Sequence, residues 1–254
     1  MAYNLASLTT TANPKPFRPI TPTAQQEGEL FRMYTPVIQR WRDSATRMMA
    51  VYALADMAAV EEEDSNTAAE IAALLLLIRW NEFFSKVESW HRSKWIADVS
   101  RARGVDATFL VRPPVAAMAG DPIGITVQQA VSANVGLIRS VSDEARARIY
   151  NAVMGGMRRG ASKDEVARQI NRGLALSRNR ARFIASDQMD KTVKAMSFAR
   201  MDEAGIVSAG WKHTPQQHPR LHHKARDGNV YRITDPIWRE LYEPNCKCQP
   251  VPVI

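Results

Sequence analysis

The chain has 254 residues, of which 45% are hydrophobic and 24% charged, with a formal net charge of +8, a composition that excludes bulk disorder. Its most apolar run, "IAALLLLI", is far shorter than the roughly 20 residues of a membrane span, and its N-terminus lacks the basic and apolar regions of a secretory signal. Two cysteines are no disulfide framework, so we expect a soluble protein made in a cytoplasm.

Residues 1–24 contain four prolines and a threonine-rich stretch. Closely spaced prolines disfavour a helix, so this segment is predicted to be an extended Pro-rich arm that needs an outside surface to order it. A disordered tail is the alternative for the isolated protein.

The pattern from residue 25 to residue 103 predicts a long helical hairpin. Pro36 is expected to kink or start the first helix, which continues to about Val60. The acidic stretch "EEEDSN" is expected to be the hinge, and the second helix is expected from about Thr67 to Arg103. Two long helices joined by a short polar turn favour an antiparallel pair.

Residues 104–125 break the helical pattern with prolines and glycines, which predicts a loop excursion. Residues 126–205 then form a basic helical region, in which we expect one helix to end at Gly160 and the last to end at Gly205. Between them, Ser162 and Glu165 have the spacing of a capping box, which predicts a short separate helix as far as Leu174.

Positive charge is concentrated between Arg139 and Arg200, where 14 Lys and Arg residues face 6 Asp and Glu residues. Such a segment indicates a polyanionic neighbour, such as nucleic acid or an acidic protein face, although a solvated helix surface is the alternative. The candidate nucleic-acid-binding residues are Arg178, Arg180 and Arg182.

Residues 206–254 differ in their sequence pattern from the helical region that precedes them. "IVSAGWKHT" and "NVYRIT" are predicted to be short strands, "PRLHHKARDG" a short helix, and the remainder proline-punctuated loops. A module of this size seldom holds together by its core alone. The predicted fold class is therefore mainly α: a long helical hairpin and helical bundle, followed by a small metal-stapled α+β C-terminal module.

The metal ion that would hold this module together is predicted from the placement of histidine and cysteine, because the last 42 residues hold both cysteines and four of the five histidines. Structural zinc takes four tetrahedral ligands and prefers thiolate and imidazole donors. Cys246, Cys248 and two of the upstream histidines would complete such a shell. Exposed histidines, an idle reduced C-x-C pair and a hydrogen-bonded polar core are the alternatives.

The C-terminal region also resembles the phage head-morphogenesis family, the Mu F-like minor capsid proteins. The resemblance covers about residues 126–254 and leaves the first 125 unmatched. It includes "RARFIASDQMDKT", in which Ser186 stands where Arg is usual. The other matching positions are Trp211, Arg220, His223, Asp227, Gly228, Pro244, Asn245, Cys246 and Cys248.

The resemblance implies that His223, Cys246 and Cys248 bind the metal. His218 stands where the family usually has other residues, and this makes it our candidate for the fourth ligand, with His213 as the alternative. The expected cofactor is a structural Zn²⁺.

The resemblance further implies a low-copy virion component that acts in head assembly inside the capsid near the portal, after synthesis in the host cytoplasm. Portal and major capsid proteins are its implied partners, packaged DNA is a further one, and no membrane is involved in the assembled head.

Two other functions compete with this one. A metal-dependent nuclease or hydrolase would need an open coordination position and a general base, for which Asp227, His222 or His213 are candidates. A simple DNA-binding protein fits the cationic segment, but no base-reading motif supports it. We expect no enzyme, because two cysteines favour a closed structural zinc site.

Overall fold

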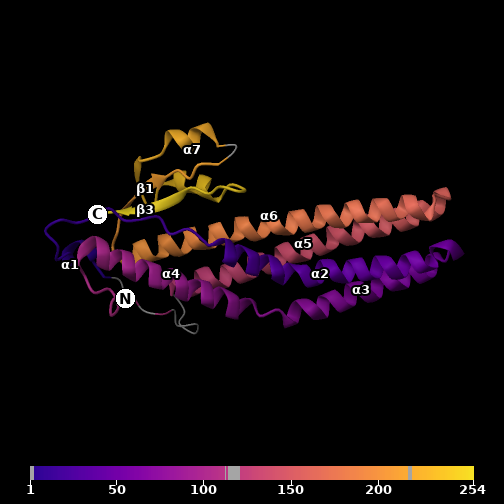
Figure 1. Ribbon diagram of the computed structural model, residues 1–254. Coiled ribbons are helices and arrows are strands. Elements are labelled where there is room, and N and C mark those ends of the chain that lie inside the picture. Colours follow the sequence, from indigo (N-terminus) through magenta and orange to yellow (C-terminus); the bar gives the residue numbers. More distant parts are fainter. Residues whose placement is uncertain (1–2, 112, 114–120, 217–218) are drawn as a thin grey trace. The chain divides into compact units, whose positions relative to one another are not determined.

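A computed structural model describes residues 3–111, 113, 121–216 and 219–254 (Figure 1). Within these residues the chain forms seven α-helices, two 3-10 segments and a three-stranded antiparallel sheet near the C-terminus, which confirms the mainly α fold class with a small α+β end. The elements are α1 Leu5–Leu8, α2 Ala24–Val51, η1 Tyr52–Leu54, α3 Met57–Leu77, α4 Trp80–Arg103, α5 Pro122–Arg159, α6 Lys163–Glu203, β1 Ser208–Lys212, α7 Leu221–Ala225, β2 Val230–Arg232, η2 Pro236–Tyr242 and β3 Gln249–Val253.

The chain divides into two compact units, each built from segments that are far apart in the sequence. Unit 1 combines Met1–Gln26, Trp80–Val131 and Asp187–Ile254, and unit 2 combines Glu27–Arg79 and Ser132–Ser186. Helices α5 and α6 contribute residues to both units, so the units do not follow the order of the segments predicted along the chain.

Unit 2 is a helical bundle of α2, α3 and parts of α5 and α6, which run alongside one another in Figure 1. Two buried pairs of polar side chains join its helices. The Tyr34 hydroxyl donates to Asn134 Oδ1 at 2.6 Å, and the Trp41 indole N–H donates to Ser142 Oγ at 2.9 Å. Because buried polar groups are costly unless they are hydrogen-bonded, these pairs fix how the helices align.

The hinge predicted at residues 61–66 is wrong, because α3 runs through it. The helix begins after Asp56, whose side chain accepts the Ala59 N–H at 3.0 Å. Inside it, Asp64 is buried and accepts hydrogen bonds from the Arg146 guanidinium of α5 at 2.5 to 3.0 Å. The predicted second helix is therefore two helices, α3 and α4, interrupted by the extended residue Ile78.

Pro36 was predicted to kink or start the first helix, and its position inside α2 excludes the start and leaves the kink. Two other predicted boundaries differ. Helix α5 begins at Pro122, within the predicted loop, because proline fits the first turn of a helix. Helix α6 continues past Leu174, where a separate helix was predicted to end. The Ser162 cap is confirmed, since its Oγ accepts the Glu165 N–H at 3.2 Å.

Two predicted helix ends are also confirmed. Gly160 and Gly205 have φ of +66° and +65°, which is the left-handed conformation that ends a helix.

The N-terminal arm packs within unit 1 and is not extended throughout, since Leu5–Leu8 form α1. Its Tyr3 N–H donates to the Glu203 carbonyl at 2.7 Å, and its Lys15 N–H donates to the Ala102 carbonyl at 3.0 Å. The side chains of Leu5 and Phe17 are buried in the unit 1 core. The surface that orders the arm is therefore supplied by the chain itself.

The C-terminal sheet belongs to unit 1 and has the order β2-β1-β3, with β1 antiparallel to both neighbours. Ala209 of β1 is opposite Tyr231 on one side and Pro252 on the other. The loops predicted after residue 234 are wrong, because η2 and β3 form there. Proline is tolerated in β3 because this is an edge strand.

Candidate metal centre

Three side chains with metal-ligating atoms meet in the C-terminal module. His223 comes from α7, and Cys246 and Cys248 come from the segment between η2 and β3. Their ligand atoms all lie within 4.8 Å of one another, and the residues are only 2%, 3% and 3% exposed. A turning backbone thus brings both sulfurs to the Nδ1 edge of the His223 ring, as the C-x-C spacing predicts.

The distances within this cluster fit a tetrahedral shell. Zinc–sulfur bonds of about 2.3 Å and zinc–nitrogen bonds of about 2.0–2.1 Å at tetrahedral angles place sulfur about 3.6 Å from nitrogen. His223 Nδ1 lies 3.5 Å from Cys246 Sγ and 3.8 Å from Cys248 Sγ. The donor set and its spacing therefore suit a zinc ion.

His213 lies at the edge of this cluster. Its Nδ1 is 3.4 Å from Cys248 Sγ, and its side chain is half-buried beyond the end of β1. It is not part of the group whose ligand atoms all lie within 4.8 Å of one another, so it contacts one sulfur and not the whole set. His218, the candidate fourth ligand, lies outside the described residues.

The two thiols ionise unequally. A hydrogen bond from Cys246 lowers the pKa of the Cys248 thiol to about 6, and the same interaction, together with burial, raises the pKa of Cys246. Burial also lowers the pKa of His223. Since metal ligands must be deprotonated, the lowered pKa values of Cys248 and His223 favour binding of a cation, whereas the raised pKa of Cys246 opposes it.

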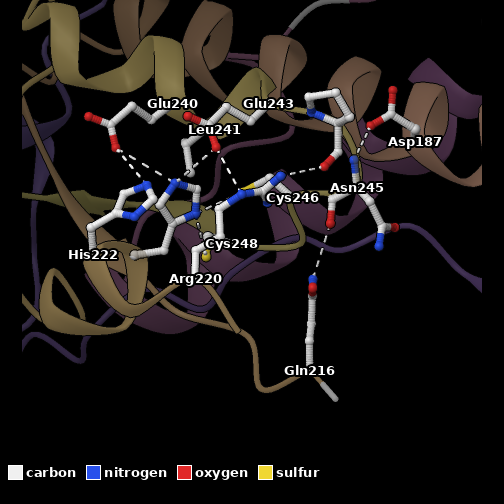
Figure 2. A network of polar contacts seen from close by, with 12 residues as sticks. Asp187, Gln216, Arg220, His222, Glu240, Leu241, Glu243, Asn245, Cys246 and Cys248 are labelled. Atoms are coloured by element: carbon white, nitrogen blue, oxygen red, sulfur yellow. Dashed lines mark hydrogen bonds and ion pairs between the residues drawn. The ribbon is translucent and has the colours of Figure 1, made fainter. Parts of the chain in front are cut away.

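Helix α6 provides a polar seat for the cysteine segment. The Asp187 carboxylate accepts the Asn245 N–H at 2.7 Å, and Asp190 pairs with Lys247 and accepts from Gln249 Nε2 at 3.3 Å. Figure 2 shows Asn245 between Asp187 and Gln216. The side-chain amide of Gln216 donates to the Asn245 carbonyl at 3.3 Å.

Lys194 completes this seat and is fully buried. Its ammonium donates to the Leu241 carbonyl at 3.1 Å and to the Cys246 carbonyl. The seat residues Asp187, Asp190 and Lys194 were not predicted as site residues. Asp187 and Asp190 lie in the segment "RARFIASDQMDKT" that carries the family resemblance, and the spacing of three and four places all three residues on one face of α6.

The other edge of His223 faces two carboxylates. Its Nε2 lies 3.6 Å from Glu240 and 3.7 Å from Glu243, while Arg226 and Arg220 pair with these two glutamates. Figure 2 shows Glu240 and Glu243 on the same side of His222. Metal-bound histidines commonly donate their second ring N–H to a carboxylate that orients the ring. Glu240 and Glu243 lie on that side of His223, but His223 Nε2 forms no hydrogen bond with them. The sequence did not single out either glutamate.

The family-motif residues also lie in this module. The Trp211 ring stacks on Trp238 with ring centroids 5.7 Å apart and meets His223 edge-on at 5.1 Å. Arg220 donates to the Pro244 carbonyl at 2.9 Å. Gly228 has a φ of +84°, and its N–H donates to the Trp211 carbonyl at 2.8 Å. The motif residues thus pack and hold the loops around the cluster.

The candidate general bases of a hydrolase have other contacts. Asp227 accepts the His213 N–H at 2.9 Å, which lowers the pKa of its carboxyl group. A lowered pKa makes it a weaker base, whereas a general base works best with a pKa near the operating pH. His222 is exposed, with its Nε2 3.7 Å from Glu240.

The candidate nucleic-acid-binding arginines lie on α6 within unit 2. Arg180 pairs with Glu144 and donates to Ser140 Oγ at 2.9 Å. The Arg182 guanidinium lies 5.2 Å from the centroid of the Phe31 ring, and Arg178 is exposed. Arg178 and Arg182 therefore share an exposed face, whereas Arg180 is held by its neighbours.

Residues 147–251 match the family described as "Phage Mu protein F like protein". This match confirms the resemblance seen in the C-terminal motif. It supports a phage head-morphogenesis protein with a capsid-related role. Among the described residues, no helix combines the length and apolar character needed to cross a bilayer.

An uncharacterized protein of Haemophilus influenzae strain Rd is 25% identical over 242 residues, which are 91% of this chain and 52% of the relative. The chain thus spans about half the length of this curated relative. The similarity also reaches well into the N-terminal half, which the motif left unmatched. No solved structure matches the chain significantly.

Proposed function

We propose that the chain is a structural minor capsid protein of a tailed phage, which acts inside the head near the portal and has a C-terminal module closed by one structural Zn²⁺. The family match supports the role in head morphogenesis. The observation that carries the zinc proposal is the nearly complete burial of Cys246, Cys248 and His223 around one point. A buried shell with two thiolate donors suits a structural ion, whereas a catalytic zinc keeps an open position for water.

We assign the fourth ligand position to His213 because its Nδ1 already contacts Cys248 Sγ. A modest movement of the His213 side chain would complete a shell of two sulfurs and two nitrogens. His218 is the competing ligand.

Elemental analysis of the purified full chain tests the zinc proposal. We expect about one zinc per chain, and cobalt substitution should give the visible spectrum of a tetrahedral site with sulfur ligands. His213→Ala should lower zinc affinity and alter the cobalt spectrum, while His218→Ala should leave both unchanged. Absence of zinc after purification without chelators, together with no uptake of added zinc, would refute the proposal.

The role in the head is tested in the phage that encodes the chain. We expect mass spectrometry of purified heads to detect the protein in a few copies, and cryo-electron microscopy to place it at the portal vertex. Deletion of its gene should lower the yield of infectious particles and be rescued by the wild-type gene. Normal particles from the deletion, or heads that lack the protein, would contradict the proposed function.

The hydrolase alternative makes a separate prediction. It requires metal-dependent cleavage of DNA that Asp227→Ala abolishes while the fold survives. We expect no such cleavage by the zinc-loaded chain.

A further inference from the structure

A surface groove in unit 2 lies between α5 and α6 and has a volume of about 440 Å³. Three arginines line it, Arg148 and Arg159 from α5 and Arg172 from α6, together with the amide side chains of Asn151 and Gln169. No carboxylate is among its lining residues. The groove is therefore cationic and rich in hydrogen-bond donors.

Two of the three arginines have no partner within the described part of the chain. Arg159 and Arg172 are exposed, and neither forms an ion pair or a hydrogen bond there. Arg148 is anchored instead: it pairs with Glu144, and its Nη1 lies 3.4 Å from Ser177 Oγ. The groove thus presents one fixed guanidinium beside two that can turn toward a ligand.

Two glycines give these arginines room. A Cβ atom at Gly155 would lie 3.0 Å from Arg159 Nη1, and one at Gly173 would lie 3.1 Å from Arg148 Cβ. Glycine within a helix costs roughly 1 kcal/mol relative to alanine. Both helices carry this cost at the positions where arginine side chains lie close to the backbone.

The surroundings of the groove are also positive. Residues 132–186, the part of unit 2 that contains the groove, include eleven Lys and Arg residues but four Asp and Glu residues. Of these four, Glu144 pairs with Arg148 and Arg180, and Glu165 accepts from Gln169 Nε2 at 3.2 Å. Nearly all of the net positive charge of the protein thus arises in this part of the chain.

We propose that this groove binds phosphate groups of a nucleic-acid backbone. The planar guanidinium fork matches phosphate oxygens in a bidentate geometry, and the amides add further donors. No aromatic side chain lines the groove, so stacking on bases is not expected there. Contacts to phosphate alone position a protein on DNA without reading its sequence.

This inference deepens the proposed function and rests on it, because packaged DNA is the polyanion that a protein inside the head meets. It also moves the predicted contact away from Arg180, which Glu144 holds, to Arg159 and Arg172.

Fluorescence anisotropy of a labelled DNA duplex with the full-length chain tests the inference at several salt concentrations. The variant R159Q/R172Q removes both unpaired guanidiniums of the groove. The matched control R158Q/R168Q removes two exposed arginines, one on α5 and one on α6, that do not line it. Far-UV circular dichroism checks that both variants keep their helices.

We expect the groove variant to lower DNA affinity by about tenfold or more. The slope of log Kobs against log[salt] should become shallower by about 1–2, since each phosphate contact contributes roughly 0.9 to it. The control should change affinity by less than about threefold. Equal losses in both variants, or no retention of DNA by the wild-type chain at low salt, would overturn the inference.

Two competitors identify the ligand chemistry. Inorganic phosphate should displace DNA only at far higher concentration, because it offers no chain of linked charges. Polyglutamate should compete poorly at equal charge. Equal competition by polyglutamate would assign the groove to an acidic protein face and overturn the assignment to nucleic acid.

The presence of the protein in purified heads is scored separately. If the protein is present in heads but the groove variant binds DNA normally, the inference alone fails. If the protein is absent from heads, the proposed function fails.

Discussion

Gly228 is a single residue on which the loops of the C-terminal module depend. Its φ of +84° lies in the left-handed region, and its N–H bonds to the Trp211 carbonyl. Gly228→Ala should therefore lower the free energy of unfolding by about 1–2 kcal/mol, the usual cost of a Cβ atom in this conformation. Urea unfolding followed by tryptophan fluorescence measures the change.

A matched substitution at Gly136 provides the control. This glycine lies inside α5, and a Cβ atom there would meet nothing within 4 Å. Gly136→Ala should stabilise the chain by up to about 1 kcal/mol, because alanine favours a helix over glycine. Destabilisation at both positions would show that the positive φ at Gly228 is not the cause.

His91 is a buried residue that makes unit 1 sensitive to acid. Burial, reinforced by the charge of Arg200, lowers the pKa of His91 from 6.5 to about 3 in the folded chain. Its ring lies 3.0 Å from Ser197 Oγ, in the same core as the buried Arg200–Glu88 ion pair. Below about pH 6.5 the unfolded chain binds a proton that the folded chain does not.

We therefore expect full stability above about pH 6.5 and a loss of up to about 1.4 kcal/mol for each pH unit as the pH falls toward 3. His91→Gln should flatten this dependence, whereas His222→Gln should not, because His222 is exposed. Urea midpoints measured between pH 4 and pH 8 show the difference. Parallel curves for the His91→Gln variant and the wild type would exclude His91 as the source.

At the scale of elements, helix α6 orders the segment that carries the cysteines. Asp187 accepts the N–H of Asn245, a residue with a φ of +59°. Asp187→Ala should cost about 2 kcal/mol, since a partly buried hydrogen bond to a charged group is lost. Asp187→Asn should restore most of the stability, because its amide oxygen still accepts that N–H.

Thermal unfolding of the three proteins, with zinc content measured in parallel, tests this role of α6. The Asp187→Ala variant should also bind zinc more weakly. Equal effects of the alanine and asparagine variants would show that the negative charge acts through Lys191, whose Nζ lies 2.7 Å from the Asp187 carboxylate, and not through the loop.

At the scale of the whole molecule, the two units should respond differently to removal of the metal. The parts of the chain that form unit 2 contain no histidine and no cysteine, whereas unit 1 holds the whole cluster with Trp211 and Trp238 packed beside it. A chelator should therefore change tryptophan fluorescence strongly but reduce the helical signal at 222 nm only slightly. Metal-dependent folding of the C-terminal module is the reason.

Adding zinc back should restore the fluorescence. An unchanged fluorescence spectrum after exhaustive chelation, or a cooperative loss of all helices, would contradict the expected difference between the two units.

Local patterns in the sequence predicted a large part of the result. Glycines marked the ends of α5 and α6, and the Ser162 cap marked the start of α6, because these signals act within one helical turn. The meeting of both cysteines with an upstream histidine was also predicted from their placement in the sequence, and the family resemblance singled out His223 among the four histidines.

The tertiary structure determined the features that depend on contacts between residues far apart in the sequence. The acidic stretch at 61–66 reads as a hinge until Arg146 of α5 compensates Asp64 and allows α3 to continue. Lys194 and Asp187 are ordinary helix residues until folding brings them to the cysteine segment more than 50 positions away. The sequence shows which charged and polar side chains need a partner when they are buried. Only the packing of the helices determines which group becomes that partner.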